Sequence, residues 1–138
     1  MDIKVSQCFV TVRDHEEALA FYRDVLGLEV RNDVQFEMLR WVTLTPPVQP
    51  EMEIILVSPA ANPNASAQDR RATEELLAKG LLNGLNFTTE DCDATFERIK
   101  AAGADVLDEP ADQFYGVRDC AFRDPSGNML RFSQPLQK

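Results

Sequence analysis

A repeated pattern of elements constrains this chain more than any other feature of its sequence. Near its start the chain reads V-T-V-R-D, then a stretch with helical spacing of apolar residues, then L-G-L-E-V. Later it reads F-T-T-E-D, a second helical stretch, and A-G-A-D-V. Duplication on this scale predicts two copies of one structural unit that bury apolar surface against each other.

Each copy is predicted to be a β-α-β-β-β unit. Asp14 with Glu17 three residues later is typical of a capped helix start, and Asp91 starts the second helix in the same way. Gly27 and Gly103 stand where a helix ends in a left-handed cap. Alternating or short apolar runs predict the strands, over residues 5–12, 28–31, 38–44, 53–57, 85–89, 117–122 and 129–133.

The two copies are separated by a segment of different composition. Residues 58–66 are rich in Pro, Asn, Ala and Ser, which indicates a linker, and residues 69–79 are predicted to form a short helix ended by Gly80. At 138 residues the chain fits one domain of the α+β class. We expect a single domain over residues 1–138, with module one at about 3–58, the linker and short helix at about 59–80, and module two at about 82–134.

Strand alternation predicts two different sheet faces. The more apolar set is expected under the helices, and it comprises Cys8, Val10, Val12, Ile54, Leu56, Leu85, Phe87, Leu130 and Phe132. The complementary set mixes polar and apolar side chains, and it comprises Gln7, Phe9, Thr11, Glu53, Ile55, Val57, Gly84, Asn86, Thr88, Met129, Arg131 and Ser133. A mixed face fits a ligand cavity and a partly solvated outer face equally well.

Composition excludes several classes of protein. The single histidine, His15, follows a helix cap and is expected at the surface, and one histidine cannot build a two-His-one-carboxylate metal site. Three widely spaced cysteines without a CxxC motif argue against zinc and favour a reducing cytoplasm. The net charge of −9 argues against nucleic acid, and the start of the chain lacks a secretory pattern. We expect a cytoplasmic protein that binds neither nucleic acid nor membrane.

Two motifs resemble one known family. The run V-R-D-H-E-E-A-L-A-F-Y-R-D-V-L-G-L-E-V resembles the opening of the glyoxalase / bleomycin-resistance / extradiol-dioxygenase superfamily, also called vicinal oxygen chelate proteins. The tail Y-G-V-R-D-C-A-F-R-D-P-S-G-N-M-L-R-F resembles its closing motif. The resemblance implies a cupped, barrel-like mixed sheet with helices outside, a cavity lined by the mixed faces, and a homodimer, with pairing of the modules within or across chains left open.

The resemblance also bears on metal binding. Family members with a metal place ligands on the first and last strand of each module, positions held here by Gln7, Ile55, Gly84 and Arg131. Ile55 and Gly84 offer no side-chain donor, and the guanidinium of Arg131 repels a divalent ion. Glu53 supplies at most one carboxylate if the register slips. We therefore expect that the metal site has been lost and that no cofactor is bound.

Nine residues are candidates for ligand binding. Arg131 is expected either to pair with Glu53 or to anchor an anionic or carbonyl-bearing ligand. Gln7 and Asn86 are expected either to orient a ligand or to bond each other. The facing of Arg40 and Trp41 is open, and Trp41 is either core or a stacking wall. The nine candidates are Gln7, Phe9, Trp41, Glu53, Asn86, Tyr115, Arg118, Met129 and Arg131.

Three functions fit these observations. The first is a metal-independent protein that holds a small organic molecule in the cup, for sequestration or resistance. The alternative is a glyoxalase-type lyase or isomerase with an atypical site, and a two-His-one-carboxylate dioxygenase is excluded. The third is a vestigial interaction domain whose sheet edges build a dimer. Catalytic residues are not assigned.

Overall fold

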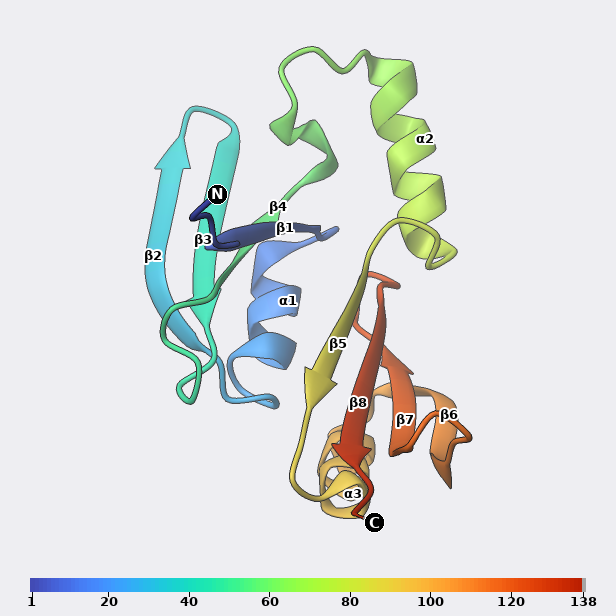
Figure 1. The fold of residues 1–138 in the computed structure, drawn as a ribbon. Coiled ribbons are helices and arrows are strands. Elements are labelled where there is room, and N and C mark those ends of the chain that lie inside the picture. Colours follow the sequence, from blue (N-terminus) through green and yellow to red (C-terminus); the bar gives the residue numbers. More distant parts are fainter. Residues whose placement is uncertain (138) are drawn as a thin grey trace.

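The predicted duplication is present in a computed structural model, which describes residues 1–137 (Figure 1). The described chain forms two four-stranded sheets, with strand order β1-β4-β3-β2 in the first half and β5-β8-β7-β6 in the second. The sheets are open and do not close into a barrel. The strands are β1 (Gln7–Thr11), β2 (Glu29–Phe36), β3 (Leu39–Thr45), β4 (Glu53–Val57), β5 (Gly84–Thr88), β6 (Asp105–Asp112), β7 (Val117–Arg123) and β8 (Met129–Pro135).

Helix starts follow the predicted caps. In α1 (His15–Tyr22) the Asp14 side chain accepts a hydrogen bond from the Glu17 amide, and in α3 (Cys92–Ala101) Asp91 accepts from the Ala94 amide. These bonds satisfy amide groups that have no partner inside the helix. The linker contains a short 3₁₀ helix, η1 (Pro59–Ala61).

Several predicted boundaries differ from the observed ones, most of them by one or two residues, and two of the differences have a clear physical cause. The linker helix α2 is Ala67–Ala78 and begins two residues earlier than expected, because Ser66 and Asp69 form a reciprocal capping box. Strand β2 continues from Glu29 to Phe36, well past the predicted end at Arg31, because it pairs with β3 in a long hairpin. The sequence of β2 is mostly polar, so it lacks the apolar alternation that would have predicted this strand.

Strand register is alike in both halves, except that β6 has a second shift, between Asp108 and Ala111. The first strand of each half pairs in parallel with the last, so Gln7 lies opposite Glu53 and Gly84 lies opposite Met129. The other neighbouring strands pair antiparallel. A register shift in β2 falls between Val30 and Asn32. The equivalent shift in β6 falls between Val106 and Asp108. The duplication therefore extends to the position of a β-bulge.

The core lies on the helix-facing side of both sheets. Val10, Leu56, Leu130 and Phe132 are buried, as the alternation predicts, and belong to one apolar cluster that runs through both halves. Phe96 of α3 packs on Phe122 of β7 at 5.3 Å between ring centroids. Cys8, Leu85 and Phe87 of the predicted apolar set are half-buried against this cluster.

Buried hydrogen bonds join the two halves. Tyr22 of α1 donates a hydrogen bond to Asp124 at 2.6 Å, and burial together with this carboxylate raises the pKa of Tyr22 well above its ordinary value. The other Asp124 oxygen accepts from the amides of Ser126, Gly127 and Asn128. The Asp-Pro-Ser-Gly-Asn turn is thus structural, since it fixes the β7–β8 connection and holds α1 against it.

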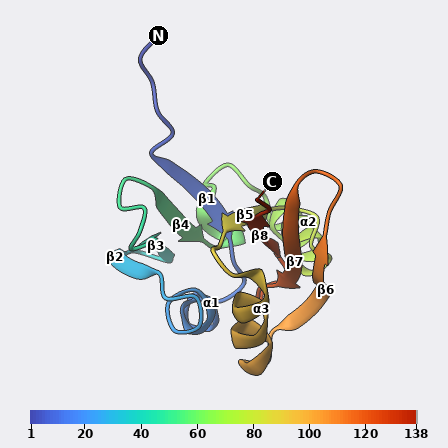
Figure 2. The same ribbon diagram turned by 60° about the horizontal axis from the view of Figure 1, so that its bottom comes forward.

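Three peripheral features complete the fold. His15, expected at the surface, is half-buried, with its ring nitrogen 3.1 Å from the Leu56 carbonyl oxygen. The six residues before β1 are exposed and project from the body (Figure 2). No helix within residues 1–137 combines the length and apolar character that a membrane span needs.

Candidate functional site

The strand register defines the face of the first sheet that turns away from the helices. Because Val10, Val42 and Leu56 share the helix side, their neighbours along each strand share the opposite side. We call this side the first cup face. It comprises Gln7, Phe9 and Thr11 of β1, Glu53, Ile55 and Val57 of β4, Trp41, Thr43 and Thr45 of β3, and Asn32, Val34 and Phe36 of β2.

The second sheet has an equivalent face. Cys120, Phe122, Leu130 and Phe132 occupy its helix side, so the alternate residues form the second cup face. It comprises Gly84, Asn86 and Thr88 of β5, Met129, Arg131 and Ser133 of β8, Val117, Asp119, Ala121 and Arg123 of β7, and Asp108 and Ala111 of β6.

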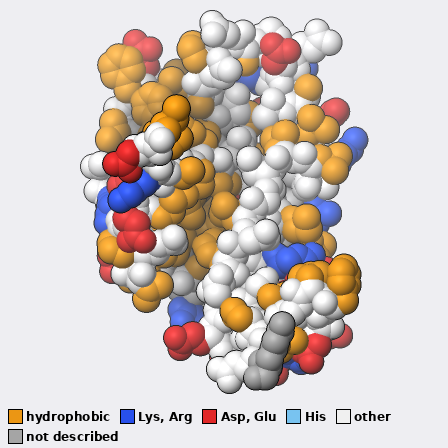
Figure 3. Space-filling view, viewed as in Figure 1, with side chains coloured by type: hydrophobic (Ala, Val, Ile, Leu, Met, Phe, Trp, Pro, Cys, Tyr) orange, Lys and Arg blue, Asp and Glu red, His pale blue; other side chains and the backbone are white. Residues whose placement is uncertain are grey.

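The first cup face combines polar side chains with a group of apolar ones, and it is partly open. Ile55 and Val57 are buried and form its floor. Around them, the exposed fractions of Phe9, Val34 and Phe36 are 59%, 49% and 62%. The space-filling view shows orange side chains gathered in a hollow over this half, whereas the surface over β5 and β8 is mostly white (Figure 3). An exposed apolar patch of this kind marks a surface that takes a partner or ligand.

Trp41, whose facing the sequence left open, lies on the first cup face. It sits opposite Val34 in the β2–β3 hairpin and is half-buried. Arg40, the residue before it, points to the other side, where it pairs with Asp33 and Glu16. Of the two interpretations, the structure therefore favours a wall of the cup over the helix-facing core.

A short polar chain runs across the end of the first cup face. Gln7 donates a hydrogen bond to Glu53 at 2.7 Å, and Arg31 from the β2 bulge reaches the other Glu53 oxygen at 3.2 Å. These two bonds hold the pKa of the Glu53 carboxyl below its ordinary value. Of the alternatives that the sequence left open, the Gln7–Asn86 bond is replaced by the bond from Gln7 to Glu53. The Glu53–Arg131 ion pair is replaced by pairs within each half, since Glu53 pairs with Arg31 and Arg131 with acids of the second half.

The second cup face carries a polar network centred on Asp119. This carboxylate is fully buried, and it accepts hydrogen bonds from Tyr115 at 2.7 Å and Gln113 at 3.1 Å, both from the β6–β7 loop. Arg131 lies between Asp119, at 3.4 Å, and Asp108, at 3.3 Å. A buried carboxylate needs such partners, so the network fixes the loop and the guanidinium together.

The remaining candidates lie in different environments. Asn86 and Met129 are exposed on the second cup face, beside Arg131 and Gly84 in the ladder. Tyr115 is at its edge, and its hydrogen bond to Asp119 raises the pKa of the phenol. Arg118 is displaced from the cup, because it lies on the α3 side of β7 and pairs with Asp93 and Asp112.

Sequence reasoning missed several residues of the two faces. Asp119 and Asp108 form half of the network around Arg131, and Val34 and Phe36 add apolar surface to the first cup. Asp119 is the single acidic residue in the strand V-R-D-C-A-F, and this pattern could have identified it from the sequence. Asp108 had no such pattern, because the bulge before it changes the side on which it lies.

The cup does not fit a divalent metal ion. Of the four positions that the family uses, Gln7 is bonded to Glu53, Ile55 and Gly84 have no donor atoms, and Arg131 is a cation. Within residues 1–137, no three His, Cys, Asp or Glu side chains are arranged as metal ligands. We derive no chemistry through a metal.

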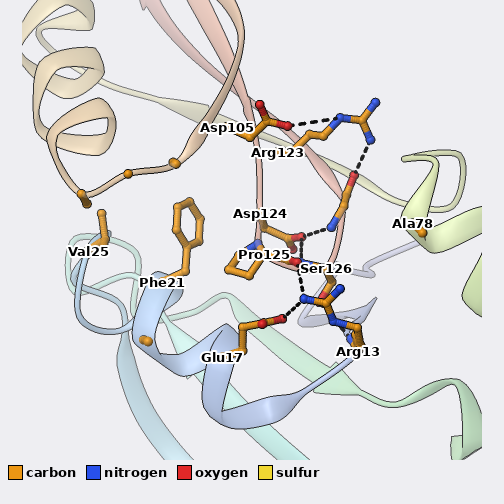
Figure 4. Close-up of a pocket in the computed structure, with 15 residues that line it drawn as sticks. Arg13, Glu17, Phe21, Val25, Ala78, Asp105, Arg123, Asp124, Pro125 and Ser126 are labelled. Carbon is orange, nitrogen blue, oxygen red and sulfur yellow. Dashed lines mark hydrogen bonds and ion pairs between the residues drawn. The ribbon is translucent and has the colours of Figure 1, made fainter.

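A separate cleft of about 560 Å³ lies between the halves, on the α1 side (Figure 4). Phe21 and Val25 form its apolar wall. Arg13 pairs with Glu17 at 2.6 Å, and Arg123 lies 3.9 Å from Asp105. None of the nine candidate residues lines it. Its arginines are already paired within the fold, which favours a structural junction.

Comparison with known proteins identifies the class to which this fold belongs. The sequence profile of the Glyoxalase/Bleomycin resistance protein/Dioxygenase superfamily matches residues 4–132. The chain therefore belongs to this superfamily, as its opening and closing motifs predicted. The uncharacterized protein YurT of Bacillus subtilis (strain 168) is 28% identical over 134 residues, which cover 97% of this chain and 99% of YurT.

Two solved structures are similar over nearly the whole chain. UcmS2 is 33% identical with a TM-score of 0.87, covering 96% of this chain and 98% of UcmS2. TnmS3, described as an antibiotic binding protein from Streptomyces sp. CB03234, is 29% identical with a TM-score of 0.73, covering 98% of each chain. Similarity thus extends to a relative that is described as an antibiotic binding protein.

Proposed function

We propose that this protein binds a small organic molecule in its cup without a metal ion, and that it sequesters a compound such as an antibiotic. The observation that carries the proposal is that one chain presents both a first cup face with exposed apolar side chains and a second cup face with hydrogen-bonding groups. Ligand sites combine a mostly apolar wall with a few fixed polar groups in this way. The antibiotic-binding relative TnmS3 supports the same function.

Binding is favoured over catalysis by the state of the polar groups. Tyr115, the nearest candidate for a proton donor, already donates its proton to a hydrogen bond with Asp119, and its raised pKa makes the phenol a weaker acid. Arg131 and Glu53 are held in ion pairs. We therefore propose a binding protein, with Gln7, Phe9, Trp41, Glu53, Asn86, Met129 and Arg131 as its ligand-facing residues.

The open cup supports a homodimer as part of this proposal. The sheets of one chain leave Phe9, Val34 and Phe36 partly exposed, and a second copy is the occupant that a symmetric assembly would supply. We propose a cytoplasmic dimer, with each cup closed in part by the other chain. Light scattering during size-exclusion chromatography checks this, and a monomer at micromolar concentration contradicts it.

The binding test uses Nile red, an uncharged aromatic probe whose fluorescence rises in an apolar site. Protein treated with a chelator should bind the probe, and Phe9→Ala should weaken binding about tenfold, since truncation removes an aromatic wall. The control is Leu76→Ala, which removes a partly exposed apolar side chain from α2, outside both cup faces.

Two results would contradict the proposal. Equal effects of Phe9→Ala and Leu76→Ala would place the probe outside the cup. A stoichiometric gain in thermal stability on adding Zn²⁺, Ni²⁺, Mn²⁺ or Fe²⁺, together with a metal requirement for probe binding, would overturn metal independence.

A further inference from the structure

The charge of Arg131 is already compensated inside the second cup face. Its guanidinium lies 3.3 Å from an Asp108 oxygen and 3.4 Å from an Asp119 oxygen, so one cation faces two carboxylates. In the first half, Arg31 and Glu53 balance each other. Arg131 and its two carboxylate partners therefore carry an excess of negative charge.

Arg131 nevertheless keeps free hydrogen-bonding capacity. A guanidinium carries five N–H donors, and the geometry here gives one hydrogen bond, from Nη2 to Asp108. The guanidinium is partly exposed, with 28% of the side chain accessible. An uncharged acceptor such as a carbonyl oxygen can therefore bind to it without disturbing either ion pair, whereas an anion would bring a third negative group to a site that already holds two.

We infer that the cup selects uncharged aromatic ligands that carry a hydrogen-bond acceptor, and that it discriminates against anionic ones, with Asp108 as the residue that sets this preference. The inference rests on the proposed function and specifies its ligand class. The acceptor meets Arg131, and the aromatic body lies on the first cup face against Phe9 and Trp41. The sequence left two ligand types open for Arg131, an anionic one and a carbonyl-bearing one, and this inference selects the second.

Asp108 is suited to an electrostatic role. More than half of its side chain is exposed, and the carboxylate pairs with Arg131, so it contributes charge to the cup and little to the core. The bulge before it turns it toward the cup, and the equivalent position of the first half is the uncharged Asn32. Asp119, in contrast, is buried and holds the β6–β7 loop, so it is unsuitable for the test.

Strand β6 also supplies a matched control. Asp112 pairs with Arg118 of β7 at 3.1 Å, as Asp108 pairs with Arg131, but on the α3 side of the sheet. The exposed fractions of the two side chains are nearly equal, at 63% and 59%. Asp112→Asn therefore changes the net charge by the same amount as Asp108→Asn while leaving the cup unchanged.

The experiment compares two fluorescent probes, uncharged Nile red and the anion anilinonaphthalene sulfonate, on wild type, Asp108→Asn and Asp112→Asn. We expect Asp108→Asn to tighten binding of the anion about threefold to tenfold, since one negative charge leaves its surroundings. Nile red affinity should stay within about twofold, because the probe carries no net charge. Asp112→Asn should change neither affinity.

The outcomes separate this inference from the function on which it rests. Unchanged affinity for the anion in Asp108→Asn, or an equal gain in Asp112→Asn, overturns the charge preference while leaving ligand binding intact. Nile red binding that is insensitive to Phe9→Ala overturns cup binding itself, and the preference with it.

Discussion

The two halves of the molecule share one scaffold and differ in the face that each turns away from its helix. Both begin their helix with an Asp cap, pair their first and last strands in parallel, and bulge at the same place. Yet the first cup face presents Phe9, Trp41 and Val34, and the second presents a network around Asp119. The helix-facing residues maintain the fold, so the opposite faces were free to diverge.

The largest expected effect tests the shared scaffold. Leu56→Ala in the first half and Leu130→Ala in the second remove fully buried side chains of one common cluster. Each should lower the free energy of unfolding by about 2 to 5 kcal/mol. Denaturant unfolding should give a single transition for both variants. Two separate transitions, or a loss confined to one variant, would show that the halves do not fold as a unit.

The next effect distinguishes the carboxylates of the two faces. Asp119→Asn places an amide group against the donors Tyr115 and Gln113 in a buried site, and it should destabilise the protein by about 1 to 3 kcal/mol. Glu53→Gln alters a more exposed ion pair and should have a clearly smaller effect on unfolding. Equal shifts of the denaturation midpoint in the two variants would mean that the network around Asp119 contributes no more to stability than the bonds of Glu53.

The smallest effect is a difference in pH dependence. Because the pKa of Glu53 is held below its ordinary 4.5, its bonds to Gln7 and Arg31 stabilise the fold above that pH and are lost as pH falls through the lowered pKa. The pKa of Tyr115 is raised above 10.0, so its bond to Asp119 is fully present below pH 10 and is lost as pH rises through the raised value.

The bonds of Glu53 on the first cup face should therefore be lost in acid, and the bond of Tyr115 on the second cup face should be lost in alkali. Carboxyl chemical shifts in wild type and Glu53→Gln report the first change. Tyrosinate absorbance in wild type and Tyr115→Phe reports the second, since Tyr22 is the chain's other tyrosine. A Tyr115 that ionises at its ordinary pKa would contradict the hydrogen bond to Asp119.

Most of the scaffold could be read from the sequence because local patterns determine it. Asp14, Asp91 and the alternation of β1, β4, β5 and β8 act over a few residues, and the family motifs fix the topology. The partners of Arg131 could not be read in the same way. They lie on β6 and β7, distant in sequence, and parity fails across the bulge before Asp108.

Trp41 shows a second reason why the sequence alone could not assign a residue to one side of its strand. Its strand carries Trp41, Thr43 and Thr45 on one side and Val42 and Leu44 on the other, so both sides contain apolar groups. Only the pairing of Val42 with Leu56 decides which side meets the helices. A half-buried aromatic residue on a two-sided strand needs that tertiary contact before its role can be assigned.

The paired bulges at Arg31 and Leu107 have a consequence for how such a cup can change. A bulge reverses the inside and outside of every residue beyond it on the strand, until the ladder regains its register. Insertion or deletion of one residue there exchanges an entire row of lining side chains at once, whereas substitution replaces them singly. Each half thus has one position where inserting or deleting a residue would change which side chains line the cup. The neighbouring strands would keep the side chains that form the core.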